Sequence, residues 1–169
     1  MTMPAVGAVA PEVALPDDRG ALHRLDEQRG RWVVLYFYPK DDTPGCTVEA
    51  CQFRDANDDL LARDAVVWGV SPQGARSKAA FRQKYGLPFD LLADEDHAVS
   101  GAYGAWTEKE RDGRRYWGIG RSTFLIDPEG RIARVWPQVR PDGHAAEVLA
   151  ALEEERADRA GRPAGTRPA

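Results

Sequence analysis

The sequence is poor in the residues that build metal centres and disulfide frameworks: its 169 residues include two cysteines and three histidines. The histidines, His23, His97 and His144, are scattered and share no spacing with either cysteine. A metal centre needs more thiolate or imidazole ligands than this arrangement offers. We therefore expect no bound metal and no bound cofactor.

Long apolar runs and an excess of basic charge are also missing. No segment approaches the ~20 consecutive apolar residues that a membrane-spanning helix needs. Residues 1–15 lack a basic region and are interrupted by Pro4 and Pro11, which is atypical of a secretory signal. The formal net charge is −4, with the 23 basic side chains spread along the chain, so nothing draws the protein to nucleic acid or to an anionic membrane. We expect a cytoplasmic protein with neither kind of partner.

What is present is the composition of an ordinary globular protein, with 43% hydrophobic and 30% charged residues. The length suits one domain, expected over residues 1–156. Residues 157–169 are rich in Ala, Arg, Gly and Pro without an apolar period, and we expect them to form a disordered tail.

In the cytoplasm thiols stay reduced, so two cysteines close in sequence indicate redox chemistry rather than a permanent disulfide.

The apolar pattern predicts an α/β protein. The unbroken apolar run 32–38 is typical of a strand covered on both faces. Other strands are expected at residues 12–15, 21–25, 65–70, 89–92, 122–127 and 131–136, and helices at residues 46–61, 75–85, 96–103 and 143–156. This order predicts a thioredoxin-like fold, a mixed central sheet flanked by helices, with an N-terminal β-hairpin added to it. No helix or strand is predicted in the polar stretch between residues 103 and 122.

Cys46 lies where the buried strand has ended at Pro39, a loop has turned, and a helix begins. A helix N-terminus carries a partial positive charge and free N–H groups, and both stabilise a thiolate. A reactive cysteine therefore fits this position. A free cysteine is equally often a small buried hydrophobic residue, and position alone does not decide between the two interpretations.

Cys51 follows five residues later on the same predicted helix. In an intact helix that separation puts the two Cα atoms roughly 8.6 Å apart. A disulfide needs Cα atoms within about 7 Å of each other. Either the two cysteines are unrelated, or the helix unwinds when they join.

The residues around Cys46 form a specific pattern, Pro39-x-x-x-Thr43-x-x-Cys46, with Cys51 following. The pattern resembles the active site of the peroxiredoxins. Segments 36–40, 43–47, 50–51, 91–97 and 121–127 extend the likeness, so that the chain is similar to the bacterioferritin comigratory protein (PrxQ) subfamily from about residue 6 to about residue 152.

The resemblance implies a thiol peroxidase that reduces hydrogen peroxide and organic hydroperoxides as an antioxidant. Cys46 would attack the peroxide and become a sulfenic acid, and Cys51 would resolve it by forming an intramolecular disulfide. That disulfide must be reduced again, which implies thioredoxin or a similar dithiol as partner. Members of the subfamily are often monomeric, and we expect a monomer.

The resemblance also assigns roles to three residues near Cys46. Thr43 would hold the peroxide through a hydroxyl that donates and accepts, although threonine also suits a helix N-cap. Pro39 would shield the pocket, or would only end the strand. Gly45, next to Pro44, would set the turn that directs backbone N–H groups at the site.

Arg121 and Glu49 complete the expected site. The chain has 19 arginines and 4 lysines, so an arginine by itself carries no weight. The position of Arg121, directly before the strand 122–127, matches the catalytic arginine of the family, whose guanidinium would support the Cys46 thiolate and bind the peroxide. Glu49 would pair with Arg121, or would only complement the helix dipole.

Two other functions remain open. A thiol–disulfide oxidoreductase acting on proteins suits the fold, but it normally needs a C-x-x-C pair at the start of the helix. A redox-gated binding protein or holdase would use the unwinding helix to expose apolar surface. Only the peroxidase predicts catalytic loss of peroxide in the presence of a thioredoxin system.

Overall fold

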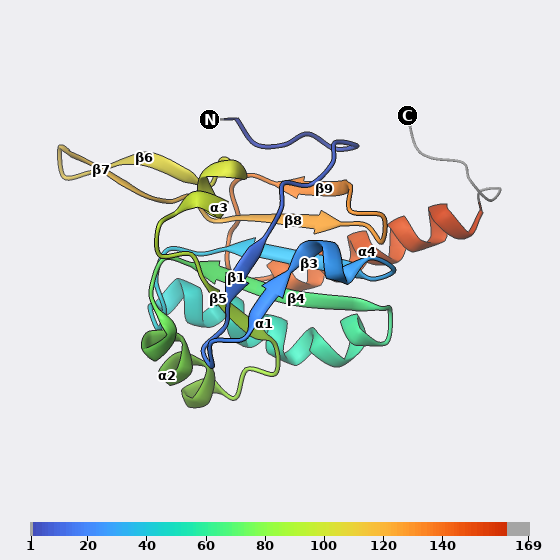
Figure 1. Cartoon of the computed structure of the whole chain (residues 1–169), viewed down its shortest axis with the longest axis horizontal. Helices are drawn as coiled ribbons and strands as arrows, with labels where there is room; N and C mark the ends of the chain where they lie inside the picture. The colour runs from blue at the N-terminus through green and yellow to red at the C-terminus, as the bar shows by residue number, and fades with distance from the viewer. Residues whose placement is uncertain (1, 162–169) are drawn as a thin grey trace.

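A five-stranded mixed sheet forms the centre of the computed structural model, which describes residues 2–161 (Figure 1). The strand order is β5-β4-β3-β8-β9. The strands are β3 (Trp32–Phe37), β4 (Ala65–Ser71), β5 (Asp90–Ala93), β8 (Ser122–Ile126) and β9 (Ile132–Trp136). β3, β4 and β5 run parallel, whereas β8 is antiparallel to both β3 and β9. The predicted mixed α/β sheet is confirmed.

β3 is the middle strand, and all six of its residues are buried. Val34 and Tyr36 belong to one hydrophobic cluster, and Val33 and Leu35 to another. Alternate side chains of a strand point to opposite faces, so β3 separates the two halves of the core. This is why the sequence there is an unbroken apolar run rather than an alternating one.

Helices cover both faces of the sheet. α1 (Pro44–Leu61) packs against α4 (His144–Ala160), and α2 (Ala75–Tyr85) joins them in the first cluster through Phe81. The short helix α3 (Ala98–Ala102) contributes Val99 to the second cluster. α1 is thereby held along one face of the sheet, and its N-terminus lies just beyond the end of β3.

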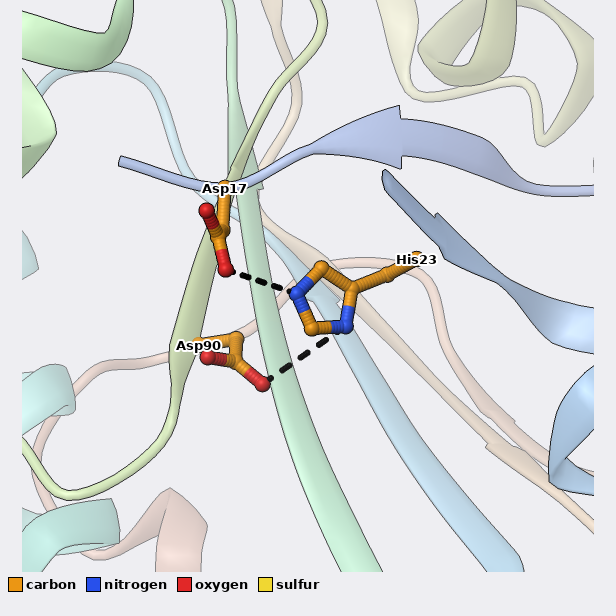
Figure 2. A group of neighbouring side chains, drawn as sticks. All are labelled: Asp17, His23 and Asp90. Carbon is orange, nitrogen blue, oxygen red and sulfur yellow. Dashed lines mark hydrogen bonds and ion pairs between the residues drawn. The ribbon is translucent and has the colours of Figure 1, made fainter. Parts of the chain in front are cut away.

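The N-terminal hairpin is present as β1 (Ala14–Pro16) paired with β2 (Leu22–Arg24), followed by the 3-10 turn η1 (Leu25–Gln28). Asp17 fixes its turn, because one carboxylate oxygen accepts the N–H groups of Arg19 (2.8 Å) and Ala21 (3.0 Å). The other oxygen lies 2.8 Å from Nε2 of His23, whose Nδ1 faces Asp90 on β5 at 3.7 Å (Figure 2). The hairpin is therefore tied to the edge of the sheet by polar contacts.

One hairpin was not predicted. β6 (Trp106–Arg111) and β7 (Arg114–Ile119) pair with each other as a separate two-stranded sheet, which extends away from the main body in Figure 1. Most of their side chains are exposed or half-buried. The stretch therefore lacks the apolar signal of a core strand, and its strands exist because they satisfy each other's backbone groups.

The ends of α4 also differ from the prediction. The helix continues to Ala160 instead of ending at residue 156, so the expected tail 157–169 begins inside it. Residues 162–169 of that tail lie outside the described residues. Among residues 2–161, none of the helices combines the length and the hydropathy needed to cross a membrane.

Candidate active site

Cys46 lies in the first turn of α1 and is almost completely buried, with 1% of its surface exposed. The helix begins at Pro44, directly after the loop that follows β3. Proline suits the first helical position, because its missing N–H would be unpaired there in any case. The thiol therefore sits at the positive end of an 18-residue helix, where its ionised form is stabilised.

Thr43 occupies the N-cap position of α1 with an extended backbone, but its side chain makes no capping hydrogen bond to the helix. Its hydroxyl instead donates to the carbonyl oxygen of Lys40 at 2.9 Å. The structure therefore does not support the capping role that was left open for Thr43. Because the only hydroxyl proton is used, the lone pairs of this oxygen are left to accept a hydrogen bond.

Arg121 lies against Cys46. Its Nη2 donates to the Sγ of Cys46 at 3.4 Å, and its Nη1 donates to Oε1 of Glu49 at 2.8 Å. Cys46 and Glu49 are three residues apart on α1, so they share one face of the helix. The guanidinium spans both groups through its planar fork, which a lysine could not do.

Glu49 is fully buried, and its Oε2 has no hydrogen-bond partner among the described residues. Burial raises the pKa of this carboxyl to about 7, although the charge and the hydrogen bond of Arg121 oppose the shift. Glu49 therefore changes its charge near neutral pH, directly beside the arginine that contacts the thiol.

Gly45 makes room for this arginine. A Cβ atom at Gly45 would lie 3.1 Å from Nη2 of Arg121 and 3.5 Å from Cγ of Pro141. The first distance is closer than side chains normally pack, so any larger residue would push the guanidinium away. The resemblance assigns Gly45 to the turn that directs backbone N–H groups at the site, and its lack of a side chain also leaves room for Arg121 beside Cys46.

Cys51 is half-buried on the unbroken helix α1, and both cysteines are free thiols in the described structure. The next residue, Gln52, joins α1 to the start of α4: it donates to Oδ1 of Asp142 at 2.7 Å and accepts from the N–H of Gly143 at 2.8 Å. An intact helix keeps Cys46 and Cys51 too far apart to bond, as the helical geometry requires.

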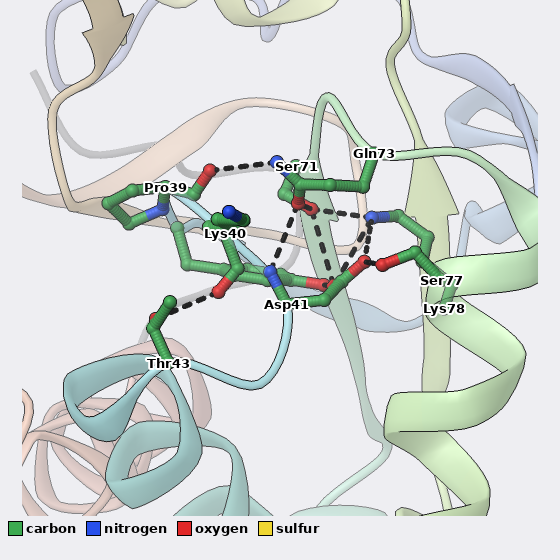
Figure 3. Close-up of polar contacts among 9 residues, drawn as sticks. Pro39, Lys40, Asp41, Thr43, Ser71, Gln73, Ser77 and Lys78 are labelled. Atoms are coloured by element: carbon green, nitrogen blue, oxygen red, sulfur yellow. Dashed lines mark hydrogen bonds and ion pairs between the residues drawn. The ribbon is translucent and has the colours of Figure 1, made fainter.

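Pro39 begins the loop between β3 and α1 and is half-buried. Its carbonyl oxygen accepts a hydrogen bond of 3.1 Å from the Gln73 side chain, as Figure 3 shows. A residue that follows β4 thus holds the loop that carries Pro39 and Thr43.

Two sets of residues near the site were not predicted. Lys109 on β6 is half-buried, and its pKa is lowered by burial and by the charge of Arg121, while Cys46 acts in the opposite direction. Asp41 and Lys78 form a buried ion pair behind the loop. The position of Lys109 had a sequence signal, because Asp112-Gly113 is a strong turn pair that predicts a hairpin here. The Asp41–Lys78 pair had none, because a lysine on a helix is expected to be exposed.

These contacts bring Cys46, Arg121, Glu49 and Gly45 together, with Thr43 one turn before Cys46 and Pro39 in the same loop. The arrangement places a thiol beside a permanent cation, at a helix N-terminus, and largely shielded from water. Such a thiol can attack an electrophile, and the guanidinium can stabilise negative charge that develops on the attacked group.

Comparisons with known proteins agree with this chemistry. Residues 6–135 match the family model described as the AhpC/TSA family. The chain is 52% identical over 147 residues to a putative peroxiredoxin bcp of Coxiella burnetii, an alignment that covers 87% of this chain and 97% of the relative. It is 45% identical over 149 residues to peroxiredoxin Bcp of Bacillus subtilis, covering 88% and 95%.

Solved structures are similar over the same region. A bacterioferritin comigratory protein of Xanthomonas campestris, studied for its alkyl peroxide reduction activity, superposes with a TM-score of 0.81 at 38% identity, covering 85% of this chain and 91% of that one. A PrxQ variant of Xylella fastidiosa gives a TM-score of 0.87 at 34% identity, covering 92% and 99%.

Proposed function

The chain belongs to the AhpC/TSA family, among the Bcp/PrxQ peroxiredoxins, and is a thiol peroxidase; from this premise we propose that Cys46 attacks the peroxide and that Cys51 resolves the product. The observation that carries the proposal is the contact of Arg121 with the Sγ of Cys46 at a helix N-terminus. No other described cysteine combines a cationic partner with such a position.

In the first step the Cys46 thiolate attacks one oxygen of the peroxide R–O–O–H. The S–O bond forms as the O–O bond breaks, and the leaving oxygen takes up a proton and departs as water or an alcohol. Arg121 stabilises the charge that develops on the peroxide oxygens, because its donors are already in place before the reaction. Thr43 accepts a hydrogen bond from the peroxide, since its own proton is held by Lys40.

In the second step the Cys51 thiol attacks the sulfur of the Cys46 sulfenic acid. The S–S bond forms, the S–O bond breaks, and water leaves. The first turns of α1 must open for the two sulfurs to meet, because the intact helix holds them apart. Gln52 lies at the edge of this segment, and its bonds to Asp142 and Gly143 favour the closed helix.

A thioredoxin-type dithiol then reduces the disulfide and is itself oxidised, which restores both thiols. Peroxide and a reductant of this general kind are the partners of a peroxiredoxin. As finer points of the proposal, thioredoxin itself is the donor, hydrogen peroxide and organic hydroperoxides are both reduced, and the protein works as a cytoplasmic monomer. A single domain contains every residue used.

The test is intact mass and free-thiol count after one equivalent of hydrogen peroxide. Wild type is expected to lose both thiols as a disulfide, Cys51→Ser to gain one oxygen at Cys46, and Cys46→Ser to stay unreactive. Wild type that keeps both thiols free at this dose would show that Cys46 is not an activated thiolate. A wild type that forms the disulfide but does not consume peroxide catalytically with a thioredoxin system would favour the oxidoreductase or the binding protein instead.

A further inference from the structure

A buried polar network lies directly behind the loop that carries Pro39 and Thr43 (Figure 3). Its centre is the ion pair of Lys78 on α2 with Asp41 in the loop, at 3.3 Å between Nζ and Oδ2. The side chain of Lys78 is 0% exposed and that of Asp41 is 2% exposed. Burial lowers the pKa of Lys78, and the carboxylate of Asp41 opposes that shift.

The network is well satisfied. Besides Lys78, Asp41 accepts hydrogen bonds from the hydroxyl of Tyr38 and from that of Ser77, the latter at 2.7 Å. Lys78 also donates to the hydroxyl of Ser71 at the end of β4. Removing two charges from water is costly, and a well-packed apolar pair often serves stability equally well. The buried ion pair is therefore weak evidence for a purely stabilising role, which leaves room for a role in positioning the loop.

The network reaches the reaction site through backbone groups on both sides of Lys40. The side-chain oxygen of Gln73 accepts the N–H of Asp41 at 3.1 Å, and its amide nitrogen donates to the carbonyl of Pro39 at 3.1 Å. The carbonyl between them, that of Lys40, accepts the hydroxyl proton of Thr43. The direction of the Thr43 lone pairs is thus set by a carbonyl whose two neighbours are fixed by Gln73 and by the ion pair.

We propose that Lys78, Asp41 and Gln73 are positioning residues for the peroxidase reaction, which hold the Lys40 carbonyl so that the Thr43 hydroxyl meets the peroxide as a hydrogen-bond acceptor. The inference rests on the proposed function of Cys46 and Thr43. It adds three residues that do not touch the substrate. They act on the peroxide step, and they leave the helix N-terminus and Arg121, which sustain the thiolate, unchanged.

This division gives a test that a purely structural role would fail. In a Cys51→Ser background only Cys46 reacts, and its second-order rate constants are measured with hydrogen peroxide and with iodoacetamide. Alkylation needs the thiolate but not Thr43. For Gln73→Ala, Lys78→Met and the double variant Asp41→Asn/Lys78→Met, we expect the peroxide rate to fall about tenfold, as for one lost transition-state hydrogen bond, and the alkylation rate to stay within about twofold.

A matched control is Arg63→Ala, which removes the ion pair of Arg63 with Glu153 at 3.8 Å, at the far end of α1. We expect it to change neither rate. Gln73 is half-buried and its replacement leaves the ion pair intact, so this variant decides the question if the charge variants do not fold. Unchanged peroxide reactivity in Gln73→Ala, or an equal fall of both rates, overturns the proposal.

Failure of the underlying function gives a different result. If the Cys51→Ser parent itself reacts with peroxide no faster than Cys46→Ser, the assignment of Cys46 is wrong and the positioning proposal falls with it. If the parent reacts and the Gln73 and Lys78 variants keep its peroxide rate, only the positioning proposal is overturned.

Discussion

The guanidinium of Arg121 lies 3.4 Å from the Sγ of Cys46, although 75 residues separate the two in the sequence. The sheet explains the contact. β3 and β8 are antiparallel, with Phe37 opposite Ser122, so the end of β3 and the start of β8 lie at the same edge of the sheet. The loop after Phe37 leads to Cys46, and Arg121 directly precedes Ser122.

Replacing Arg121 tests this contact. Arg121→Met should lower the second-order rate of sulfenic acid formation by about 10- to 100-fold, because a charge-assisted hydrogen bond to the reacting group is lost. Arg121→Lys should restore only part of the rate, since an ammonium group cannot span Cys46 and Glu49. Stopped-flow measurement with hydrogen peroxide gives both values. Arg134→Met, which removes an arginine paired with Glu154 and Glu155, is the matched control and should react like wild type.

Glu49 should make the stability of the protein depend on pH. Its pKa is raised by burial from 4.5 to about 7, so between these values the folded protein keeps a proton that the unfolded chain releases. The contribution of Glu49 to the free energy of unfolding is therefore most favourable below pH 4.5. It falls as the pH rises to about 7, by on the order of 3 kcal/mol.

Glu49→Gln should remove this dependence, which urea unfolding at pH 5, 6, 7 and 8 would measure. The difference in unfolding free energy between wild type and Glu49→Gln should change across this range. Glu153→Gln, at an exposed position, should follow wild type at every pH. Parallel curves for wild type and Glu49→Gln would contradict the assigned pKa.

Gln52 should slow the closure of the disulfide. Its two hydrogen bonds hold α1 to Asp142 and Gly143, and each contributes about 0.5–1.5 kcal/mol to the closed helix. Gln52→Ala should therefore speed disulfide formation several-fold without changing the preceding attack on peroxide. Rapid quenching with an alkylating agent followed by mass analysis separates the two steps. An unchanged closure rate would mean that α1 opens without releasing Gln52.

Asp17 should contribute strongly to stability. Its carboxylate accepts two backbone N–H groups and contacts His23, and these hydrogen bonds lower its pKa against the opposing effect of burial. Asp17→Ala leaves these partners unsatisfied and should cost about 2–4 kcal/mol in urea unfolding. That stability is present above pH 3.8 and is lost as the pH falls through the lower folded pKa. Asp26→Ala, which removes an exposed pair with Arg24, should change stability by less than ~1 kcal/mol.

The core elements could be predicted from the sequence because burial leaves a direct trace in it. The apolar run of β3, the strand of β4 and the helix α2 were predicted within one or two residues of their observed bounds. The strands β8 and β9 were predicted as well, and the short turn between them is fixed locally: Asp127 accepts the N–H groups of Glu129 and Arg131, and Gly130 adopts a positive φ. These patterns depend only on residues that are close together in the sequence, so they can be recognised without knowing how distant segments pack.

The hairpin of β6 and β7 could not be predicted from the apolar pattern. Its strands are rich in charged residues, so the apolar pattern gave no strand. Asp112 and Gly113 both have a positive φ, as a tight hairpin turn requires, and the Asp-Gly pair was the available signal. Charged strands pair because each satisfies the backbone of the other, which no periodicity of hydrophobic residues records.

The resemblance predicted two contacts of the candidate site that the structure contains, Arg121 with Cys46 and Glu49 with Arg121, but not the packing around them. The pattern from Pro39 to Cys46 is contiguous, and the helix start follows from the chain itself. That Gly45 leaves space for Arg121, and that Lys78 is buried against Asp41, depends on how distant segments pack. Such contacts have no counterpart in the linear order of residues.

The antiparallel register of β3 and β8 also limits how the chain can change in length. One residue advances a strand by about 3.3 Å and turns its side chain to the opposite face. An insertion or deletion within β3 or β8 would therefore shift the register of this pair and move Arg121 away from its place beside Cys46. The turn at Asp112 and Gly113 lies outside the main sheet, so additions there leave that distance untouched. The hairpin of β6 and β7 can therefore vary in length during evolution or in protein engineering. The paired strands β3 and β8 cannot, because their register places Arg121 beside Cys46.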